Sequence, residues 1–338
     1  MTALGRPTLE EVAALAGVGR GTASRVINGS AQVSARSRDA VLSAVAELGY
    51  VPNPAARSLV TRRTDTVALV ISEPEDRLFG EPFFAGIVRG ISGAINESSR
   101  QLVLALAQTP EQSARLDAYL TSQHVDGVLL VSLHGEDPLP SRLRDRGLPT
   151  VLGGRPLGQL DAAYVDIDNV GGAVLAVEHL VATGRERIAT ICGPQDMAAG
   201  LDRLSGYQQG LASAGRPLDP ALLAVGDFSE DSGAVGMRQL LERSPDLDAV
   251  FAANDSMAAG ALRTLRDSGR NVPEQVALVG FDDSALARHT DPQLTTVHQP
   301  TEQMGREMAR LLLAQITGDG HGLEQQILPA RLVVRAST

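Results

Sequence analysis

Hydrophobic residues in the first 50 positions recur at spacings of three and four, which predicts short helices. Thr8 and Glu11 have the spacing of a capping box, in which a hydroxyl and a carboxylate satisfy free amides at a helix start. A helix of about two turns should follow, and the glycines within residues 17–19 should end it. A second helix should cover about residues 20–27, and a third, capped by Ser34, should come next.

From about residue 66 the pattern changes, because short apolar runs alternate with amphipathic segments. Apolar residues recur every four positions from Phe83 to Ile95, as on a helix that covers a core. This alternation predicts parallel sheets with helices on both faces, and ligands bind beyond the carboxyl ends of such strands. The remaining 275 residues or so suffice for two such lobes. The predicted buried strands are 67–71, 102–106, 128–131, 188–191, 250–253 and 276–279.

Two short helices joined by a glycine turn and braced by a third form a helix-turn-helix. The second helix would present Arg20, Thr22, Ser24 and Arg25 outward. A small helical cap or an oligomerisation domain would show the same spacing. Arginine can fork onto guanine O6 and N7 while hydroxyls hold phosphates, so the side chains of this helix favour DNA binding.

The charge of the 338-residue chain is unevenly distributed. A net charge of −10 argues against a generic nucleic-acid or membrane binder. However, residues 1–63 hold eight arginines and four acids, a balance of +4, whereas the remainder holds 22 arginines and 36 acids, a balance of −14. A basic head on an acidic body is typical of a nucleic-acid-binding module joined to another domain.

Composition excludes several kinds of chemistry. All 30 basic residues are arginine, which excludes a phosphate-binding loop with its lysine and a Schiff-base lysine. No G-x-S-x-G occurs, residues 17–21 lack the third glycine of a dinucleotide fingerprint, and the six histidines lack metal-ligand spacing. We therefore expect no enzyme, cofactor or metal. Cys192 is the single cysteine, and the absence of a signal-like segment or an apolar run of about 20 residues predicts a cytoplasmic protein outside the membrane.

The run from Thr8 to Leu59 resembles the DNA-binding head of the lactose/galactose-repressor (LacI/GalR) family almost without gaps. The resemblance continues through the body, which in that family looks like a periplasmic sugar-binding protein with two doubly wound parallel-sheet lobes. We predict a helix-turn-helix domain over 1–50, a hinge segment with a hinge helix over 51–63, an N-terminal lobe of 64–167 plus 295–321, and a C-terminal lobe of 168–294 plus 322–338.

The resemblance assigns roles to the second helix. Its first two residues read bases in the family, and here these are Arg20 and Gly21. By the same match, contacts to phosphates or base edges would come from Thr22, Ser24, Arg25 and Asn28. Two positions depart from the family, since Gly19 replaces a capping serine and Gly21 offers no side chain to a base. Readout should therefore rest more heavily on Arg20 and Arg25.

Asn53 and Pro54 could begin a short helix after the head, because asparagine caps helices and proline suits the first helical position. So short a helix is marginal alone, and composition favours a plain linker. The resemblance instead implies a hinge helix that folds on the operator, with Leu59 wedged into the minor groove. The implied DNA contacts of this segment are Asn53, Ala56 and Leu59.

Polar and aromatic residues gather at the predicted strand ends, in the stretches VDIDN, DRLSGY, GDF, AAND and GFDD. These stretches match positions that line the effector cleft of the family. The match implies that ligand hydroxyls are bound by Arg203, Asn254 and Asp282. Phe228 would stack on a sugar face, Phe83 and Asp168 would complete the wall, and Arg155 is a further candidate. This chemistry suits a sugar, although Asp and Asn at strand ends also cap the following helix.

The expected protein is a cytoplasmic, homodimeric repressor of carbohydrate-utilisation genes, at the nucleoid when bound to DNA. Two heads would read the inverted half-sites of a palindromic double-stranded operator, and a sugar in the cleft would release it. One alternative is a purine or sugar phosphate as effector, possibly a corepressor, for which extra cationic groups are expected in the cleft. Another is a free sugar-binding protein, which would have no use for a helix-turn-helix.

Overall fold

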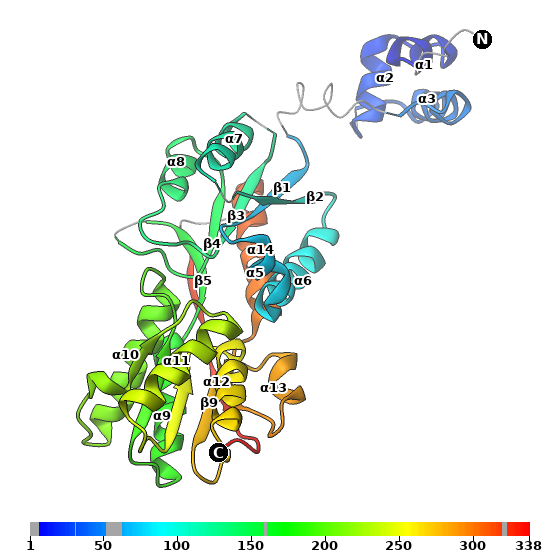
Figure 1. Cartoon of the computed structure of the whole chain (residues 1–338). Coiled ribbons are helices and arrows are strands. Elements are labelled where there is room, and N and C mark those ends of the chain that lie inside the picture. The colour runs from blue at the N-terminus through cyan, green and yellow to red at the C-terminus, as the bar shows by residue number, and fades with distance from the viewer. Residues whose placement is uncertain are drawn as a thin grey trace. The chain divides into compact units, whose positions relative to one another are not determined.

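The computed structural model describes residues 7–30, 32–51, 63–107, 109–122, 124–158, 161–319 and 323–338. The chain divides after Thr64 into a head and a body, which are compact units (Figure 1). The predicted hinge contacts Asn53, Ala56 and Leu59 lie outside the described residues.

The head contains the three predicted helices, α1 (Leu9–Leu15), α2 (Arg20–Ile27) and α3 (Ala35–Leu48). The capping box of α1 is present, since the Thr8 hydroxyl accepts from the Glu11 amide at 3.3 Å and the Glu11 carboxylate accepts from the Thr8 amide at 2.7 Å. Gly17, with φ of +65°, makes the turn before α2. One face of each helix is buried in a shared core of Val12, Ala13, Ala23, Val26, Val41 and Ala44.

The body consists of an N-terminal lobe (N-lobe) and a C-terminal lobe (C-lobe), each built on one sheet. The sheet of the N-lobe has six parallel strands in the order β11-β5-β4-β3-β1-β2. Its strands are β1 (Thr66–Ile71), β2 (Gln101–Leu106), β3 (Gly127–Val131), β4 (Thr150–Gly153), β5 (Ala163–Ile167) and β11 (Gln325–Leu328). Its helices are α5 (Glu75–Gly80), α6 (Pro82–Asn96), α7 (Pro110–Thr121), α8 (Leu139–Asp145) and α14 (Thr301–Thr317). Alternate residues of β1 pack on α6 and α14 on one face and on α7 and α8 on the other, which confirms the predicted layers.

The C-lobe sheet has the order β12-β10-β9-β8-β6-β7 and is parallel except for β12, which runs antiparallel to β10. Its strands are β6 (Ile188–Cys192), β7 (Leu223–Val225), β8 (Ala249–Ala252), β9 (Ala277–Asp282), β10 (Thr295–His298) and β12 (Arg331–Val333). Its helices are α9 (Asn169–Ala182), α10 (Ala198–Ser213), the 3-10 turn η1 (Pro220–Leu222), α11 (Glu230–Arg243), α12 (Asp255–Asp267) and α13 (Ala285–His289). Helices α9 and α10 cover one face and α11 and α12 the other.

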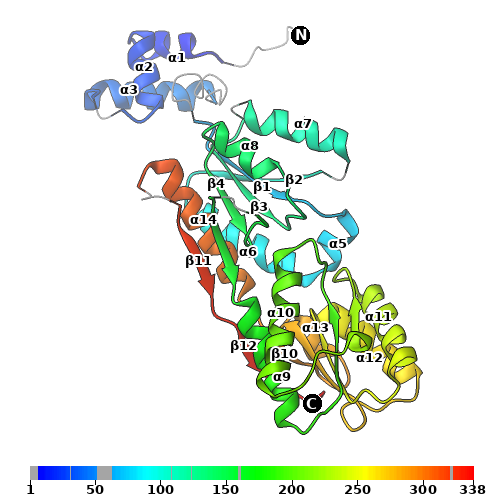
Figure 2. The same cartoon turned by 90° about the vertical axis from the view of Figure 1, so that its left-hand side faces the viewer.

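The chain crosses between the lobes three times, after β5, after β10 and between β11 and β12 (Figure 2). The predicted lobe boundaries are corrected here. β10, assigned to the N-lobe from sequence, pairs with β9 in the C-lobe, and β11, assigned to the C-lobe, pairs with β5 in the N-lobe. Both strands have only four residues and mix polar with apolar side chains, TTVH and QQIL, so no continuous apolar run marked them.

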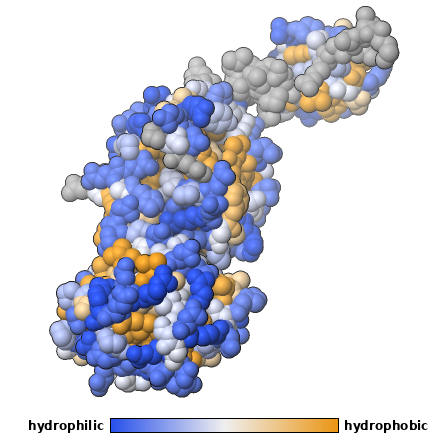
Figure 3. Space-filling model, in the orientation of Figure 1, coloured by the Kyte–Doolittle hydropathy of each residue, from blue (hydrophilic) through white to orange (hydrophobic). Residues whose placement is uncertain are grey.

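The face of the body in Figure 3 is mostly hydrophilic, with limited apolar patches.

Candidate functional site

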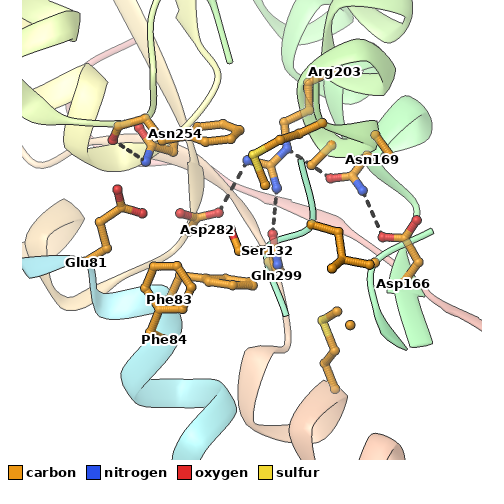
Figure 4. Close-up of a pocket in the computed structure, with 18 of the residues that line it drawn as sticks. Glu81, Phe83, Phe84, Ser132, Asp166, Asn169, Arg203, Asn254, Asp282 and Gln299 are labelled. Atoms are coloured by element: carbon orange, nitrogen blue, oxygen red, sulfur yellow. Dashed lines mark hydrogen bonds and ion pairs between the residues drawn. The ribbon is translucent and has the colours of Figure 1, made fainter. Parts of the chain in front are cut away.

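A cavity lies between the two lobes of the body, beyond the carboxyl ends of strands from both sheets (Figure 4). The N-lobe lines it with Arg77, Glu81, Phe83, Phe84, Ser132, Leu133, Gly153, Gly154, Arg155, Asp166 and Met304. The C-lobe and the crossing segments line it with Asn169, Met197, Ala198, Ala199, Arg203, Phe228, Asn254, Asp282 and Gln299. Six of the seven predicted residues are therefore brought together, all except Asp168.

Arg203, on α10, connects several parts of the cavity. The side chain is buried, and Nε donates at 2.9 Å to Oδ1 of Asn169, the first residue of α9. One terminal nitrogen donates to the Ala253 carbonyl at 2.6 Å. The other donates at 2.8 Å to Oε1 of Gln299, which lies in the crossing segment after β10. Burial lowers the pKa of Arg203, opposed by nearby carboxylates, the largest contribution coming from Asp282.

Asp282 ends β9 and faces Arg203, with 3.6 Å between its Oδ1 and the guanidinium. Burial raises the pKa of Asp282 well above its usual value, although Arg203 lowers it, and the carboxylates of Asp255 and Glu81 raise it further. Its backbone has a φ of +107°, which is rare outside glycine and concentrates at functional sites. In Figure 4, Glu81 points from the N-lobe toward Asp282 and Asn254. Burial raises the pKa of Glu81 to about 7, although Arg77 opposes the shift.

Phe228 forms an aromatic wall on the C-lobe side. Its ring is nearly buried, and the guanidinium carbons of Arg77 and Arg203 lie 5.4 and 5.7 Å from its centroid. A Cβ at Gly193 would lie 2.4 Å from the ring, so this position needs glycine. Asn254 accepts from the Met257 amide at 2.8 Å and donates to the Phe228 carbonyl at 2.8 Å, so it both caps α12 and positions Phe228.

Phe83 supplies the second aromatic surface, from the N-lobe. Its ring lies 5.2 Å from that of Phe84 in an edge-to-face arrangement. Phe84 is buried among the helices of the N-lobe, whereas Phe83 is only partly buried. Of the aromatic residues in the lining, Phe83 therefore offers more accessible apolar surface than Phe228 or Phe84.

Two charged contacts join the lobes beside the cavity. Arg155, after β4, forms an ion pair with Asp166 of its own lobe at 3.4 Å and another with Asp202 of α10. His134, after β3, contacts Asp196 of the C-lobe through Nδ1 at 2.9 Å. Its Nε2 lies 3.0 Å from Glu73 of the N-lobe, and these hydrogen bonds raise the pKa of His134, with the Glu73 bond contributing most.

Asp168 does not line the cavity, and its predicted role in the wall is corrected. Its side chain is exposed and accepts from the Gly171 amide at 2.8 Å, which caps α9. Asp166 and Asn169, in the same stretch, face the cavity instead, joined by a hydrogen bond of 3.2 Å. The sequence signal was present in VDIDN, but which acid turns inward depends on where the strand ends and the helix begins.

Other lining residues were missed by sequence reasoning. Arg77 and Glu81 lie where α5 meets α6, away from any strand end, and form an ion pair of 2.8 Å. Gln299 lies in the crossing segment after β10, a strand that the hydrophobic pattern did not reveal. No local signal distinguishes these three residues from ordinary surface positions.

Helix α2 presents a polar face on the head. Arg20, Gly21, Arg25 and Asn28 are exposed, whereas Thr22 and Ser24 are partly buried. Arg25 Nε donates to the Gly21 carbonyl at 3.1 Å, and Asn28 donates to the Ser24 hydroxyl at 3.3 Å. Gly19 begins the helix without a side-chain cap, as its residue type predicts.

Across the described residues, no group of three or more His, Cys, Asp or Glu side chains is placed to hold a metal ion. None of the described helices is long and apolar enough to cross a membrane.

A helix-turn-helix head joined to a two-lobed body, with a cavity between the lobes that aromatic and charged side chains line, defines a ligand-responsive DNA-binding regulator of transcription. Residues 8–53 match the bacterial regulatory proteins of the lacI family, and residues 177–338 match the periplasmic binding protein-like domain. The HTH-type transcriptional regulator CelR of Thermobifida fusca is 59% identical over 334 residues, with 98% of each chain covered. The chain belongs to the LacI family, whose members are transcriptional regulators and not enzymes.

More distant relatives and solved structures agree with this assignment. The HTH-type transcriptional repressor CytR of Escherichia coli (strain K12) is 35% identical over 335 residues, covering 98% of this chain and 96% of its own. A solved complex of the transcriptional regulator CelR with cellobiose is 57% identical with a TM-score of 0.80, covering 98% of this chain and all of that one. The lac repressor dimer bound to operator and the anti-inducer ONPF is 28% identical with a TM-score of 0.85 and 99% of each chain covered.

Proposed function

We propose that this chain is a homodimeric repressor of carbohydrate-utilisation genes that leaves a palindromic operator when a neutral sugar binds between its lobes. Cellobiose is the favoured effector, because a regulator 57% identical over 98% of this chain was solved with that sugar. The structure of a lac repressor dimer on its operator supports the dimer. A two-fold dimer would in turn read a palindrome, because its two heads are related by the same symmetry as the half-sites. The site of action would be the cytoplasm, at the nucleoid while the operator is occupied.

The observation that carries the choice of a neutral effector is the pairing of charges in the cavity. Three arginines line it, and each already faces a carboxylate. The pairs are Arg77 with Glu81 and Glu73, Arg155 with Asp166 and Asp202, and Arg203 with Asp282. A phosphate would have to displace a carboxylate and then lie near several others, at a cost in Coulomb energy. Sugar hydroxyls donate and accept hydrogen bonds and need no such displacement.

We assign roles within this cavity to the predicted residues. Arg203 and Asp282 would bind adjacent hydroxyls, because their polar groups face each other from α10 and β9. Phe83 would cover an apolar ring face, and Phe228 would complete the wall beside it. Asn254 would act mainly by holding Phe228, since both ends of its amide are already hydrogen-bonded.

A sugar that contacts both lobes would favour the arrangement in which residues of the two lobes lie close enough to bind it together. It changes DNA binding only to the extent that it binds this arrangement more tightly than others. In a dimer, movement of the lobes would alter the spacing of the two segments that precede β1. Linkage requires the operator to weaken sugar binding by the same factor by which the sugar weakens operator binding.

Calorimetric titration of the full chain with cellobiose, glucose, a sugar phosphate and a purine tests the effector. We expect cellobiose to bind most tightly and to raise the Kd for a selected palindromic duplex in fluorescence anisotropy. A sugar phosphate or purine that binds at least about tenfold tighter, a difference of about 1.4 kcal/mol, would overturn the proposal. Sedimentation with and without the duplex tests the dimer, and a monomer on DNA would contradict it.

A further inference from the structure

We propose that Glu10, on α1, is a positioning residue that determines operator specificity by orienting Arg20 at the start of α2. The inference rests on the proposed reading of a base by Arg20. Beyond that base contact, we infer that the Nε edge of the Arg20 guanidinium is held by Glu10, which leaves the edge with the two terminal nitrogens for a guanine.

The contact joins two helices of the head. Arg20 Nε lies 2.9 Å from Glu10 Oε1, and the two side chains are 72% and 60% exposed. Because Nε is engaged, the two terminal nitrogens remain as the pair of donors that can fork onto guanine O6 and N7. Arg20 therefore forms an ion pair with an acid of a different helix, within the part of the head that the structure describes.

Arg25 shows the same division of its guanidinium by a different means. Its Nε donates to the Gly21 carbonyl one turn earlier in α2, at 3.1 Å. Both exposed arginines of this helix thus use Nε within the protein, so the terminal nitrogens are the donors left for DNA. Arg25 achieves this with its own helix backbone, whereas Arg20, at the first helical position, depends on a carboxylate from α1.

The start of α2 carries no negative charge of its own. Gly19 provides no side-chain cap, and the first turn of α2 contains no acidic residue, although a helix N-terminus favours negative charge. A long arginine side chain loses rotamer entropy when it is fixed, so a contact that already orders it lowers this cost at binding. Glu10 supplies both the missing negative charge and the orientation before DNA arrives.

The same carboxylate carries a cost for DNA binding in general. Glu10 is exposed beside the polar face of α2, where it repels phosphates of any sequence. We therefore expect Glu10 to lower affinity for random DNA while raising discrimination at one base pair. These two effects are separable, because one depends on charge and the other on a hydrogen-bond acceptor.

The test uses the full chain and a palindromic duplex that the wild-type protein selects from a randomised library. Fluorescence anisotropy gives the Kd for this duplex, for single base-pair variants of each half-site and for a random duplex. The variants are Glu10→Ala, Glu10→Gln, Arg20→Ala and the double variant Glu10→Ala with Arg20→Ala. Glu47→Ala is the matched control, because Glu47 is an exposed acid on α3.

Arg20→Ala should lower discrimination at one base pair by at least about fivefold. Glu10→Ala should lower discrimination at the same base pair by about two- to fivefold, the range of an exposed ion pair. Glu10→Gln keeps an acceptor for Nε, so it should retain more of this discrimination than Glu10→Ala while binding random DNA as tightly as Glu10→Ala does. Glu47→Ala should leave discrimination at that base pair unchanged.

The outcomes distinguish base reading by Arg20 from the positioning of Arg20 by Glu10. If Arg20→Ala alters no base preference, the proposed base reading by Arg20 is wrong, and the role of Glu10 falls with it. If Arg20→Ala alters a preference that Glu10→Ala leaves intact, only the positioning role is wrong. If Glu10→Ala still changes discrimination in the Arg20→Ala background, Glu10 contacts DNA itself, which also overturns the proposal. Circular dichroism of each variant confirms that the helices remain folded.

Discussion

Replacement of Arg203 by alanine should damage both the effector response and the stability of the body. The guanidinium donates three hydrogen bonds, to Asn169, to the Ala253 carbonyl and to Gln299, and faces Asp282 at 3.6 Å. Arg203→Ala leaves these groups buried without their donor. Because Asn169 begins α9 just after the crossing that follows β5, and Gln299 lies in the crossing that follows β10, the loss weakens two of the three connections between the lobes as well as the cavity.

The size of the effect follows from this burial. Breaking a buried ion pair by removing one partner costs about 3–5 kcal/mol. The pKa of Asp282 is already raised by burial, so this carboxyl can take up a proton when Arg203 is absent, which limits the loss. We therefore expect the lower end, about 3 kcal/mol, which for a domain of more than 150 residues lowers Tm by roughly 6–12 °C.

Thermal unfolding of the full chain by calorimetry measures this shift, and anisotropy at 25 °C measures operator binding with and without cellobiose. Arg203→Ala should still bind the operator, since the head is a separate compact unit, but cellobiose should no longer release it. Arg263→Ala is the control, because Arg263 is a half-exposed arginine of α12 paired with Glu230 on the surface. A Tm for Arg203→Ala within about 2 °C of the wild type would contradict this prediction, since it corresponds to a loss of less than about 1 kcal/mol.

Three further predictions concern pH, a helix cap and a glycine. The hydrogen bonds to Glu73 and Asp196 raise the pKa of His134. The contact of His134 with Asp196, which holds the two lobes together, is therefore fully stabilising below the ordinary histidine pKa of about 6.5. This stabilisation is lost as the pH rises through the raised pKa. Sugar affinity should therefore fall by about two- to fivefold from pH 6 to pH 9, because the bond to Asp196 is partly exposed, and His134→Ala should remove this part of the dependence. Asp168→Ala should cost about 1 kcal/mol in thermal unfolding, as the loss of a helix cap, and leave sugar affinity unchanged. Gly193→Ala should lower sugar affinity in calorimetry by about tenfold, because its Cβ would displace the ring of Phe228 at a cost of about 1–3 kcal/mol.

Each of these three has a control or a contradicting result. A pH profile of His134→Ala that parallels the wild type would assign the dependence to other groups, such as Glu81. A loss of sugar affinity in Asp168→Ala would return that residue to the cavity wall. Gly93→Ala serves as the control for Gly193→Ala, because nothing lies within 4 Å of a Cβ at position 93.

The sequence alone determined the features that depend on near neighbours along the chain. The capping box of Thr8 and Glu11, the glycine turn before α2 and the alternation of buried strands and helices all follow from local spacing. The spacing of apolar residues within a short segment shows which face of a helix or strand is buried. It can therefore be found without knowing what that face packs against. The placement of Arg203, Phe228 and Asp282 beside one cavity followed from the resemblance of their strand-end motifs to a known family.

Contacts between residues far apart in the chain depend on the three-dimensional fold. His134 and Asp196 are 62 positions apart and Arg203 and Gln299 are 96 apart, so no periodicity connects them. The choice of Asp166 over Asp168, and the exchange of β10 and β11 between the lobes, depended on how short strands pair across a sheet. Pairing of this kind is set by the whole topology, because a strand of four residues buries too little surface of its own to identify its partner.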